Sequence, residues 1–157
     1  MTERYRQCVA VIVTDGQGNI LLCERSDRKY SGSIQTVQGG IEPGETPREA
    51  AARELGEELG LQPDAFVFVD ELDATFTYRW NEEYLAAVHS DFVGQEQRFF
   101  LAQVAHDAVF DLEQHHREFA RVMWGTGAEL LKRCWERKRP GFAAALAAFG
   151  LIASVEA

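Results

Sequence analysis

Residues 46–60 constrain the fold more than any other stretch, because they carry the start and stop signals of an α-helix. Thr46 suits the N-cap, Pro47 suits the first helical position, and Glu49 completes a capping box. Gly60 fits the left-handed position that ends many helices. The sequence therefore predicts a helix over most of this stretch.

The polar side of this predicted helix carries more carboxylates than helix stability favours. Leu55 and Leu59 share an apolar face that can pack on a sheet, whereas Glu54, Glu57 and Glu58 share a different face. Like charges at i, i+3 and i+4 destabilise a helix by roughly 0.2–0.5 kcal/mol per pair. Glu57 and Glu58 also lie near the helix C-terminus, where the macrodipole disfavours anions. Helix stability therefore does not explain why three glutamates occupy these positions.

Two interpretations of the glutamates are open. An isolated pattern of this kind is usually a solvated acidic face. Here a glycine-rich loop at residues 39–45 precedes the helix, and Arg53 adjoins the carboxylates. Converging carboxylates can hold Mg²⁺ against phosphate oxygens, because a hard cation prefers oxygen ligands and keeps several waters. The residues favour a divalent-metal site for phosphate chemistry.

The remaining pattern indicates a mixed α/β chain. Strands are predicted at residues 8–13, 20–23, 34–37, 66–69 and 99–104, and further helices at residues 129–138 and 142–149 with a break at Pro140 and Gly141. Turn residues between the first two strands predict a hairpin. No repeat or linker divides the sequence, so we expect one domain over residues 1–157.

Composition excludes several classes of protein. The 157 residues carry a net charge of −9, which argues against duplex DNA binding driven by net charge. The longest apolar stretch, residues 142–153, is interrupted by Gly150 and is too short for a membrane span of about 20 residues. Cys8, Cys23 and Cys134 lack Cys-x-x-Cys spacing, which indicates reduced packing residues in a cytoplasmic protein.

The spacing around the predicted helix resembles the pattern of the Nudix hydrolases. That pattern is a glycine, five residues, a glutamate, seven residues, and then Arg-Glu-aliphatic-x-Glu-Glu-x-Gly-aliphatic. The chain matches it at Gly39, Glu45, Arg53, Glu54, Leu55, Glu57, Glu58, Gly60 and Leu61. The resemblance implies a Nudix fold, with a mixed β-sheet sandwiched between helices. It also implies hydrolysis of a diphosphate linked to another moiety, with Mg²⁺ or Mn²⁺ as cofactor.

The resemblance also implies roles for individual residues. Glu54, Glu57 and Glu58 would ligate the metal, together with a backbone carbonyl of Gln38 or Gly39. Arg53 would orient the glutamates, and Glu45 would support the loop before the helix.

Further motifs resemble the branch that contains RNA 5′-pyrophosphohydrolases and dinucleoside-polyphosphate hydrolases. They are Tyr5-Arg6, Gln38-Gly39-Gly40, residues 94–101, Glu118-Phe119 and Lys138-Arg139-Pro140. Glu118 would be a metal ligand or general base. The chain departs from the branch where it has Ile34, Val37, Arg137 and Phe142, and it lacks the usual Pro-Asn after Arg6. These departures spare the metal site and concern base recognition.

Candidate substrate contacts come from these motifs and from isolated basic and aromatic residues. They are Arg6, Arg25, Tyr78, Gln95, Lys138 and Arg139, with Trp80 as a further stacking candidate. The alternative is partial core packing for the two aromatic residues, and a solvated helix face for the basic cluster at residues 132–139. His115 and His116 are not expected to bind metal, because adjacent side chains on a strand point apart.

These observations predict a metal-dependent pyrophosphohydrolase in which metal and a glutamate, Glu118 or Glu57, activate water. The expected substrate is a triphosphorylated or diphosphorylated RNA 5′ end, or a dinucleoside polyphosphate. A nucleoside triphosphate pyrophosphatase and a non-catalytic nucleotide-sensing module are the alternatives. The sequence does not fix the oligomeric state, although a monomer is favoured.

Overall fold

A computed structural model describes residues 2–27, 33–113 and 117–152. Within those ranges, seven strands form one mixed sheet. The central strand is β1 (Tyr5–Thr14), which pairs in parallel with β6 (Gly94–Gln103) over its whole length. On its other side, β1 pairs antiparallel with β4 (Val37–Gly40) and, at its end, with β2 (Ile20–Arg25). The predicted hairpin between the first two strands is confirmed.

The outer strands extend the sheet in both directions. The long strand β5 (Val67–Arg79) pairs antiparallel with β6 and forms one edge. On the other side of the sheet, β2 lies between β3 (Ile34–Gln35) and β7 (Phe119–Gly125) and is antiparallel to both. The strand predicted at residues 34–37 is therefore two short strands, because the chain leaves β2 at Thr36 and joins β1.

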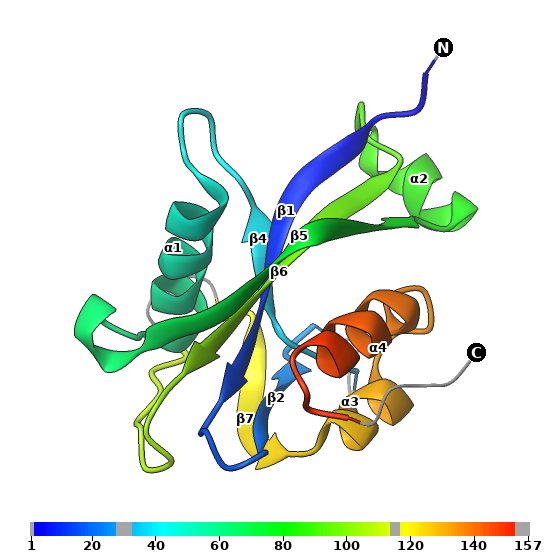
Figure 1. Ribbon diagram of the computed structural model, residues 1–157. Helices are drawn as coiled ribbons and strands as arrows, with labels where there is room; N and C mark the ends of the chain where they lie inside the picture. Colours follow the sequence, from blue (N-terminus) through cyan, green and yellow to red (C-terminus); the bar gives the residue numbers. More distant parts are fainter. Residues whose placement is uncertain (1, 28–32, 114–116, 153–157) are drawn as a thin grey trace.

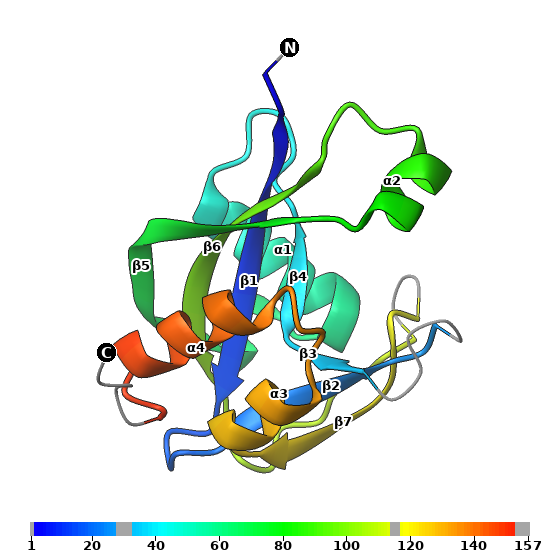
Figure 2. The ribbon, with the colours of Figure 1, turned by 90° about the vertical axis from the view of Figure 1, so that its right-hand side faces the viewer.

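Helices cover both faces of the sheet. The helix α1 (Pro47–Leu59) lies on one face, and α3 (Gly127–Arg133) and α4 (Arg139–Ala148) lie on the other, as Figures 1 and 2 show. The short helix α2 (Glu82–Val88) follows β5 at the end of the sheet, and the 3₁₀ turn Pro63–Ala65 precedes that strand. The expected sheet between helices is confirmed.

The core has two halves because side chains alternate across β1. Val9 and Val11 pack on the α1 side with Leu55, whereas Ala10 and Ile12 pack with α3 and α4. The three cysteines are buried and free, as expected for packing residues. In the described ranges no helix is long and apolar enough to cross a membrane.

The predicted ends of α1 are also confirmed. The hydroxyl of Thr46 accepts a hydrogen bond from the Glu49 backbone N–H, and the Glu49 carboxylate accepts one from the Thr46 N–H. Gly60 has a left-handed backbone with φ of 69° and its N–H bonds to the last turn. The helix that carries the glutamates is thus fixed by local signals at both ends.

Other expected boundaries are wrong. Gly39 and Gly40 belong to β4 and not to the loop, because their backbone pairs with Val9 and Cys8. The break between the last two helices lies at residues 134–138 and not at Pro140 and Gly141, so the helix predicted at residues 129–138 ends early, at Arg133. The proline occupies the first turn of α4, where no N–H donor is needed. The two strands predicted at residues 66–69 and 99–104 are each longer, and neither α2 nor β7 was expected.

Candidate active site

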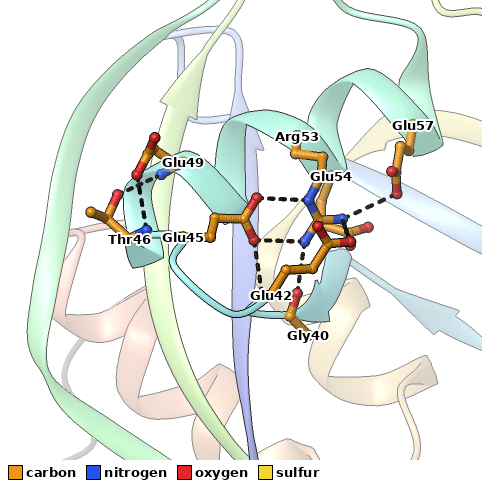
Figure 3. A network of polar contacts seen from close by, with 8 residues as sticks. All are labelled: Gly40, Glu42, Glu45, Thr46, Glu49, Arg53, Glu54 and Glu57. Atoms are coloured by element: carbon orange, nitrogen blue, oxygen red, sulfur yellow. Dashed lines mark hydrogen bonds and ion pairs between the residues drawn. The ribbon is translucent and has the colours of Figure 1, made fainter.

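Arg53 of α1 is the centre of a polar network that joins the helix to the preceding loop (Figure 3). Its guanidinium donates to both carboxylate oxygens of Glu45, at 2.8 and 2.9 Å, and to the backbone carbonyl of Gly40 at 2.8 Å. It also donates to Glu54 at 2.8 Å and to Glu57 at 3.3 Å. The planar fork of an arginine can serve several acceptors at once, so one side chain orients two of the three glutamates.

Glu45 belongs to the network but does not line the cavity in which the other glutamates meet. The hydrogen bond from Arg53 lowers the pKa of Glu45, which is therefore firmly ionised. Glu45 also accepts a hydrogen bond from the Glu42 backbone N–H at 3.0 Å, which closes the loop before the helix. Glu45 thus holds the loop against α1, as the sequence predicted for a supporting residue.

Glu54 and Glu58 are buried, which is unusual for glutamates of a helix surface. Burial, and then the negative charges of Glu57 and Glu118, raises the pKa of Glu54 even though Arg53 opposes the change. Burial, and then the charges of Glu54 and Glu118, raises the pKa of Glu58 well above its ordinary value. The solvated acidic face considered from the sequence is therefore wrong for these two residues, and positive charge beside them would favour their ionised forms.

The two glycines of β4 allow close approach of charged side chains. A Cβ atom at Gly39 would overlap the carboxylate of Glu54, and one at Gly40 would overlap the guanidinium of Arg6. On the same strand, the Gln38 backbone N–H donates to Glu58 at 3.2 Å. The strand therefore receives side chains from α1 and β1 at positions where a larger residue could not fit.

These groups line an open, acidic cavity of about 290 Å³. The cavity brings together most of the predicted site residues: Arg6, Arg25, Gln38, Gly39, Glu54, Glu57, Glu58, Gln95 and Glu118. Glu118 is exposed and reaches the cavity from the segment before β7, where Ser26 binds its backbone carbonyl at 3.0 Å. Arg53 lies behind the cavity wall and not in it.

A second, more apolar cavity of about 110 Å³ adjoins the first and shares four residues with it, Arg25, Gln35, Gln38 and Gln95. Its aromatic walls come from β5, α2 and the turn before α4. The rings of Trp80 and Tyr84 are 5.0 Å apart, and those of Tyr78 and Trp135 are 5.7 Å apart. Sequence reasoning missed Tyr84, because its ring meets Trp80 only when Asn81 caps α2 and places Tyr84 in the first turn of that helix.

Comparison with known proteins identifies the family of this chain. A family model for the NUDIX domain matches residues 4–145. The chain belongs to this family. It is 34% identical over 147 residues to an RNA pyrophosphohydrolase of Roseobacter denitrificans, covering 92% of this chain and 91% of that protein. It is 36% identical over 149 residues to an RNA pyrophosphohydrolase of Erythrobacter litoralis, covering 93% and 91%. This Nudix protein is accordingly a hydrolase that acts on phosphoanhydride bonds.

Solved Nudix-type structures share the fold at low sequence identity. The Escherichia coli dihydroneopterin triphosphate pyrophosphohydrolase has a TM-score of 0.70 and 17% identity, with 90% of this chain and 97% of that chain covered. A Caenorhabditis elegans Ap4A hydrolase has a TM-score of 0.62 and 14% identity, with 93% and 98% covered. These likenesses confirm the architecture of the sheet and its helices.

The Nudix family generally uses divalent metal ions, and the donor set here fits one. Glu54, Glu57, Glu58 and Glu118 all line one cavity, and burial, followed by the charge of neighbouring carboxylates, raises the pKa values of Glu54 and Glu58. Within the described ranges, no group of three or more His, Cys, Asp or Glu side chains is yet arranged so that it could hold a metal ion.

The basic cluster at residues 132–139 divides between the site and the surface of this Nudix protein. Lys138 is buried and lines the aromatic cavity, where burial and then the positive charge of Arg25 lower its pKa to about 7. Arg139 is exposed, lines neither cavity and donates to the Leu131 carbonyl at 2.7 Å. Arg137 donates to the Arg79 carbonyl at 2.9 Å. His115 and His116 lie outside the described residues.

Proposed function

We propose that this Nudix hydrolase cleaves a phosphoanhydride bond in the polyphosphate at the 5′ end of an RNA. The curated relatives at 34% and 36% identity bear the name RNA pyrophosphohydrolase, which supports this substrate class. The observation that carries the proposal is the shared wall between an acidic cavity and an aromatic cavity. A polyphosphate in the first cavity would continue directly to a nucleoside in the second.

The acidic cavity would hold the polyphosphate with Mg²⁺ or Mn²⁺. Glu54, Glu57 and Glu58 would be the main protein ligands, with Glu118 and a backbone carbonyl at Gln38 or Gly39 as further ligands. A divalent cation bound there would neutralise phosphate charge and lower the pKa of the attacking water.

The protein groups would perform the remaining work. Arg53 would keep Glu54 and Glu57 in place through the hydrogen bonds described above. Arg6 and Arg25 line the acidic cavity and would neutralise charge that develops on the leaving phosphate. A carboxylate, either Glu118 or Glu57, would accept the proton of the attacking water.

The aromatic cavity would bind the nucleoside. Its rings come from Tyr78, Trp80, Tyr84 and Trp135, and a base has an apolar face that aromatic side chains stack on. Ile34 and Trp135 line the cavity, whereas Arg137 bonds to the backbone of Arg79. We therefore assign base contact to Trp135 in place of Arg137.

A side-by-side turnover assay tests the proposal. A short 5′-triphosphate RNA, diadenosine tetraphosphate and a nucleoside triphosphate are compared at equal concentration, with Mg²⁺ and separately with Mn²⁺. Fastest release of phosphate or pyrophosphate from the RNA supports the proposal. Fastest cleavage of the dinucleotide would assign the enzyme to dinucleoside polyphosphates, which the aromatic cavity would also accommodate.

Two variants identify the residues that act in this reaction. Glu57→Gln and Glu118→Gln each remove one charge without changing the size of the side chain. The general base should lose at least about 100-fold in kcat with substrate affinity kept, in line with the usual contribution of such a group. Binding without turnover in the wild-type protein would instead support a nucleotide-sensing module.

A further inference from the structure

Gln97 of β6 is a buried polar residue that this mechanism does not use. Only 2% of its surface is exposed, and it lines neither cavity. Its side-chain nitrogen donates to the side-chain oxygen of Gln38 at 3.1 Å and to that of Gln95 at 3.3 Å. Gln97 therefore lies between two residues of the wall that the cavities share.

The chemistry of the neighbours fixes the direction of these hydrogen bonds. The amine of Lys138 donates to Oε1 of Gln38 at 2.9 Å, and an amide oxygen can only accept. The hydroxyl of Tyr78 donates to Oε1 of Gln95 at 2.7 Å, and burial raises the pKa of Tyr78, which keeps that proton in place. The side-chain oxygens of Gln38 and Gln95 thus each accept two hydrogen bonds, one of them from the Gln97 nitrogen.

This direction determines what the two glutamines present to the cavities. An amide carries its oxygen and its NH₂ group on opposite sides, so oxygens held by Gln97 leave the NH₂ groups of Gln38 and Gln95 turned elsewhere. Both residues line both cavities. Among the described residues, neither NH₂ group donates a hydrogen bond to another protein group. Two donors are therefore available at the junction of the cavities.

We infer that Gln97 is a positioning residue, which keeps the NH₂ groups of Gln38 and Gln95 at the junction as donors to the phosphate that joins the polyphosphate to the nucleoside. The inference rests on the proposed function, because it assumes that a substrate crosses from one cavity to the other. It makes Gln97 important for substrates that cross the junction. A polyphosphate without a nucleoside needs these donors less.

Binding of two probes tests this role without turnover. Calorimetry in Mg²⁺ would compare inorganic tripolyphosphate with α,β-methylene-ATP, which carries a nucleoside and resists hydrolysis at that position. Gln97→Met keeps the length of the side chain and removes both donated hydrogen bonds. It should weaken the nucleotide about tenfold and tripolyphosphate less than about threefold.

The matched control is Gln7→Met on the neighbouring strand β1. Gln7 also donates from its side-chain amide, to Glu96 at 2.8 Å, but it is exposed and lines neither cavity. Affinity for both probes should be unchanged in this variant. A fall in melting temperature with equal weakening of both probes would show that Gln97 acts only on stability, and would overturn the inference.

Two further variants keep the test decisive if Gln97→Met folds poorly. Gln97→Glu places an acceptor against two acceptor oxygens, so the selective loss should be larger than for methionine. Tyr78→Phe keeps the ring and removes only the hydroxyl that holds Gln95, so the loss should be smaller but equally selective. For hydrolysis of 5′-triphosphate RNA, Gln97→Met should raise KM more than it lowers kcat.

The outcomes separate this inference from the proposed function. Nucleotide binding that depends on Gln97, without hydrolysis of RNA by the wild-type protein, would retain the inference and reject the RNA substrate. Hydrolysis of RNA with no selective effect in the Gln97 variants would do the reverse. A wild-type protein that neither binds the nucleotide nor hydrolyses RNA would reject both.

Discussion

Lys138 donates a 2.9 Å hydrogen bond to the side chain of Gln38, although the two residues are 100 positions apart in the sequence. The lysine precedes the first residue of α4 and the glutamine lies in β4. The ammonium group also lies 5.6 Å from the centre of the Tyr78 ring. One buried lysine thus joins the start of α4 to β4 and β5 at the wall between the acidic and aromatic cavities.

Replacing Lys138 by Met should lower kcat/KM for 5′-triphosphate RNA. The variant removes a charge-assisted hydrogen bond, worth about 1.5–3 kcal/mol, which corresponds to roughly a 10- to 100-fold loss. Lys132→Met is the matched control, because Lys132 is exposed in α3 and lines neither cavity. Equal rates for the Lys138 variant and the wild type would contradict the placement of Lys138 beside the substrate.

Gly39→Ala should abolish most activity, whereas Gly56→Ala should not. A Cβ at Gly39 would displace the Glu54 carboxylate, and a shift of about 1 Å in a catalytic group can cost about 100-fold in rate. At Gly56, near the C-terminal end of α1, the added Cβ would meet only the Leu61 carbonyl at 3.5 Å. That variant should gain about 0.5–1 kcal/mol of helix stability. Steady-state kinetics and thermal unfolding of both variants would check this contrast.

Arg53→Lys should impair activity although the substitution keeps the positive charge. A lysine ammonium cannot serve Glu45, Glu54, Glu57 and the Gly40 carbonyl together. We expect a loss of roughly 10- to 100-fold in activity or metal affinity, as for other groups that orient metal ligands. The control is Arg48→Lys, on the exposed side of the same helix. If Arg53→Lys retains full metal affinity and rate, the orienting role is wrong.

Asp15 should make stability depend on pH in the acid range. Its side chain is fully buried, which opposes ionisation, but hydrogen bonds from Asn19, the Gln17 N–H and His106 outweigh burial and lower its pKa to about 2. Because the folded pKa lies below the ordinary value, the contribution is complete above about pH 4 and is lost as the pH falls towards 2.

Asp15→Asn tests that dependence away from the active site. The variant should melt about 2–4 °C below the wild type at neutral pH, for a loss of about 1 kcal/mol. Melting curves between pH 7 and pH 3 should show the difference narrowing at the acid end. A constant difference over that range would exclude ionised Asp15 as its source.

Local signals in the sequence predicted the part of the site that α1 carries. The capping box at Thr46 and Glu49 and the glycine at its end depend on residues within one or two turns, so they could be found without the fold. The burial of Glu58 could not be found this way. It depends on β4, whose pairing with β1 is set by contacts distant in sequence.

Elements that depend on tertiary contacts were missed. The helix α2 has only seven residues and none of them is buried, so no buried apolar face of any length marks it in the sequence. The strand β7 has mixed burial and owes its pairing to β2. The aromatic cavity includes Tyr84 of α2, and the glutamine network joins β4 to β6, which are brought together by their pairing with β1. The role inferred for Gln97 therefore depends on the three-dimensional structure.

The parallel pairing of β1 with β6 has a consequence for synthesis in the cell. Tyr5 pairs with Gly94, so an apolar strand made at the start of translation has no partner on that side until most of the polypeptide has left the ribosome. Such long-range pairing slows folding and prolongs the exposure of hydrophobic surface. Nascent chains of this enzyme should therefore engage chaperones early. A ribosome that stalls before residue 138 would release a product that has the four glutamates of the acidic cavity but lacks Lys138.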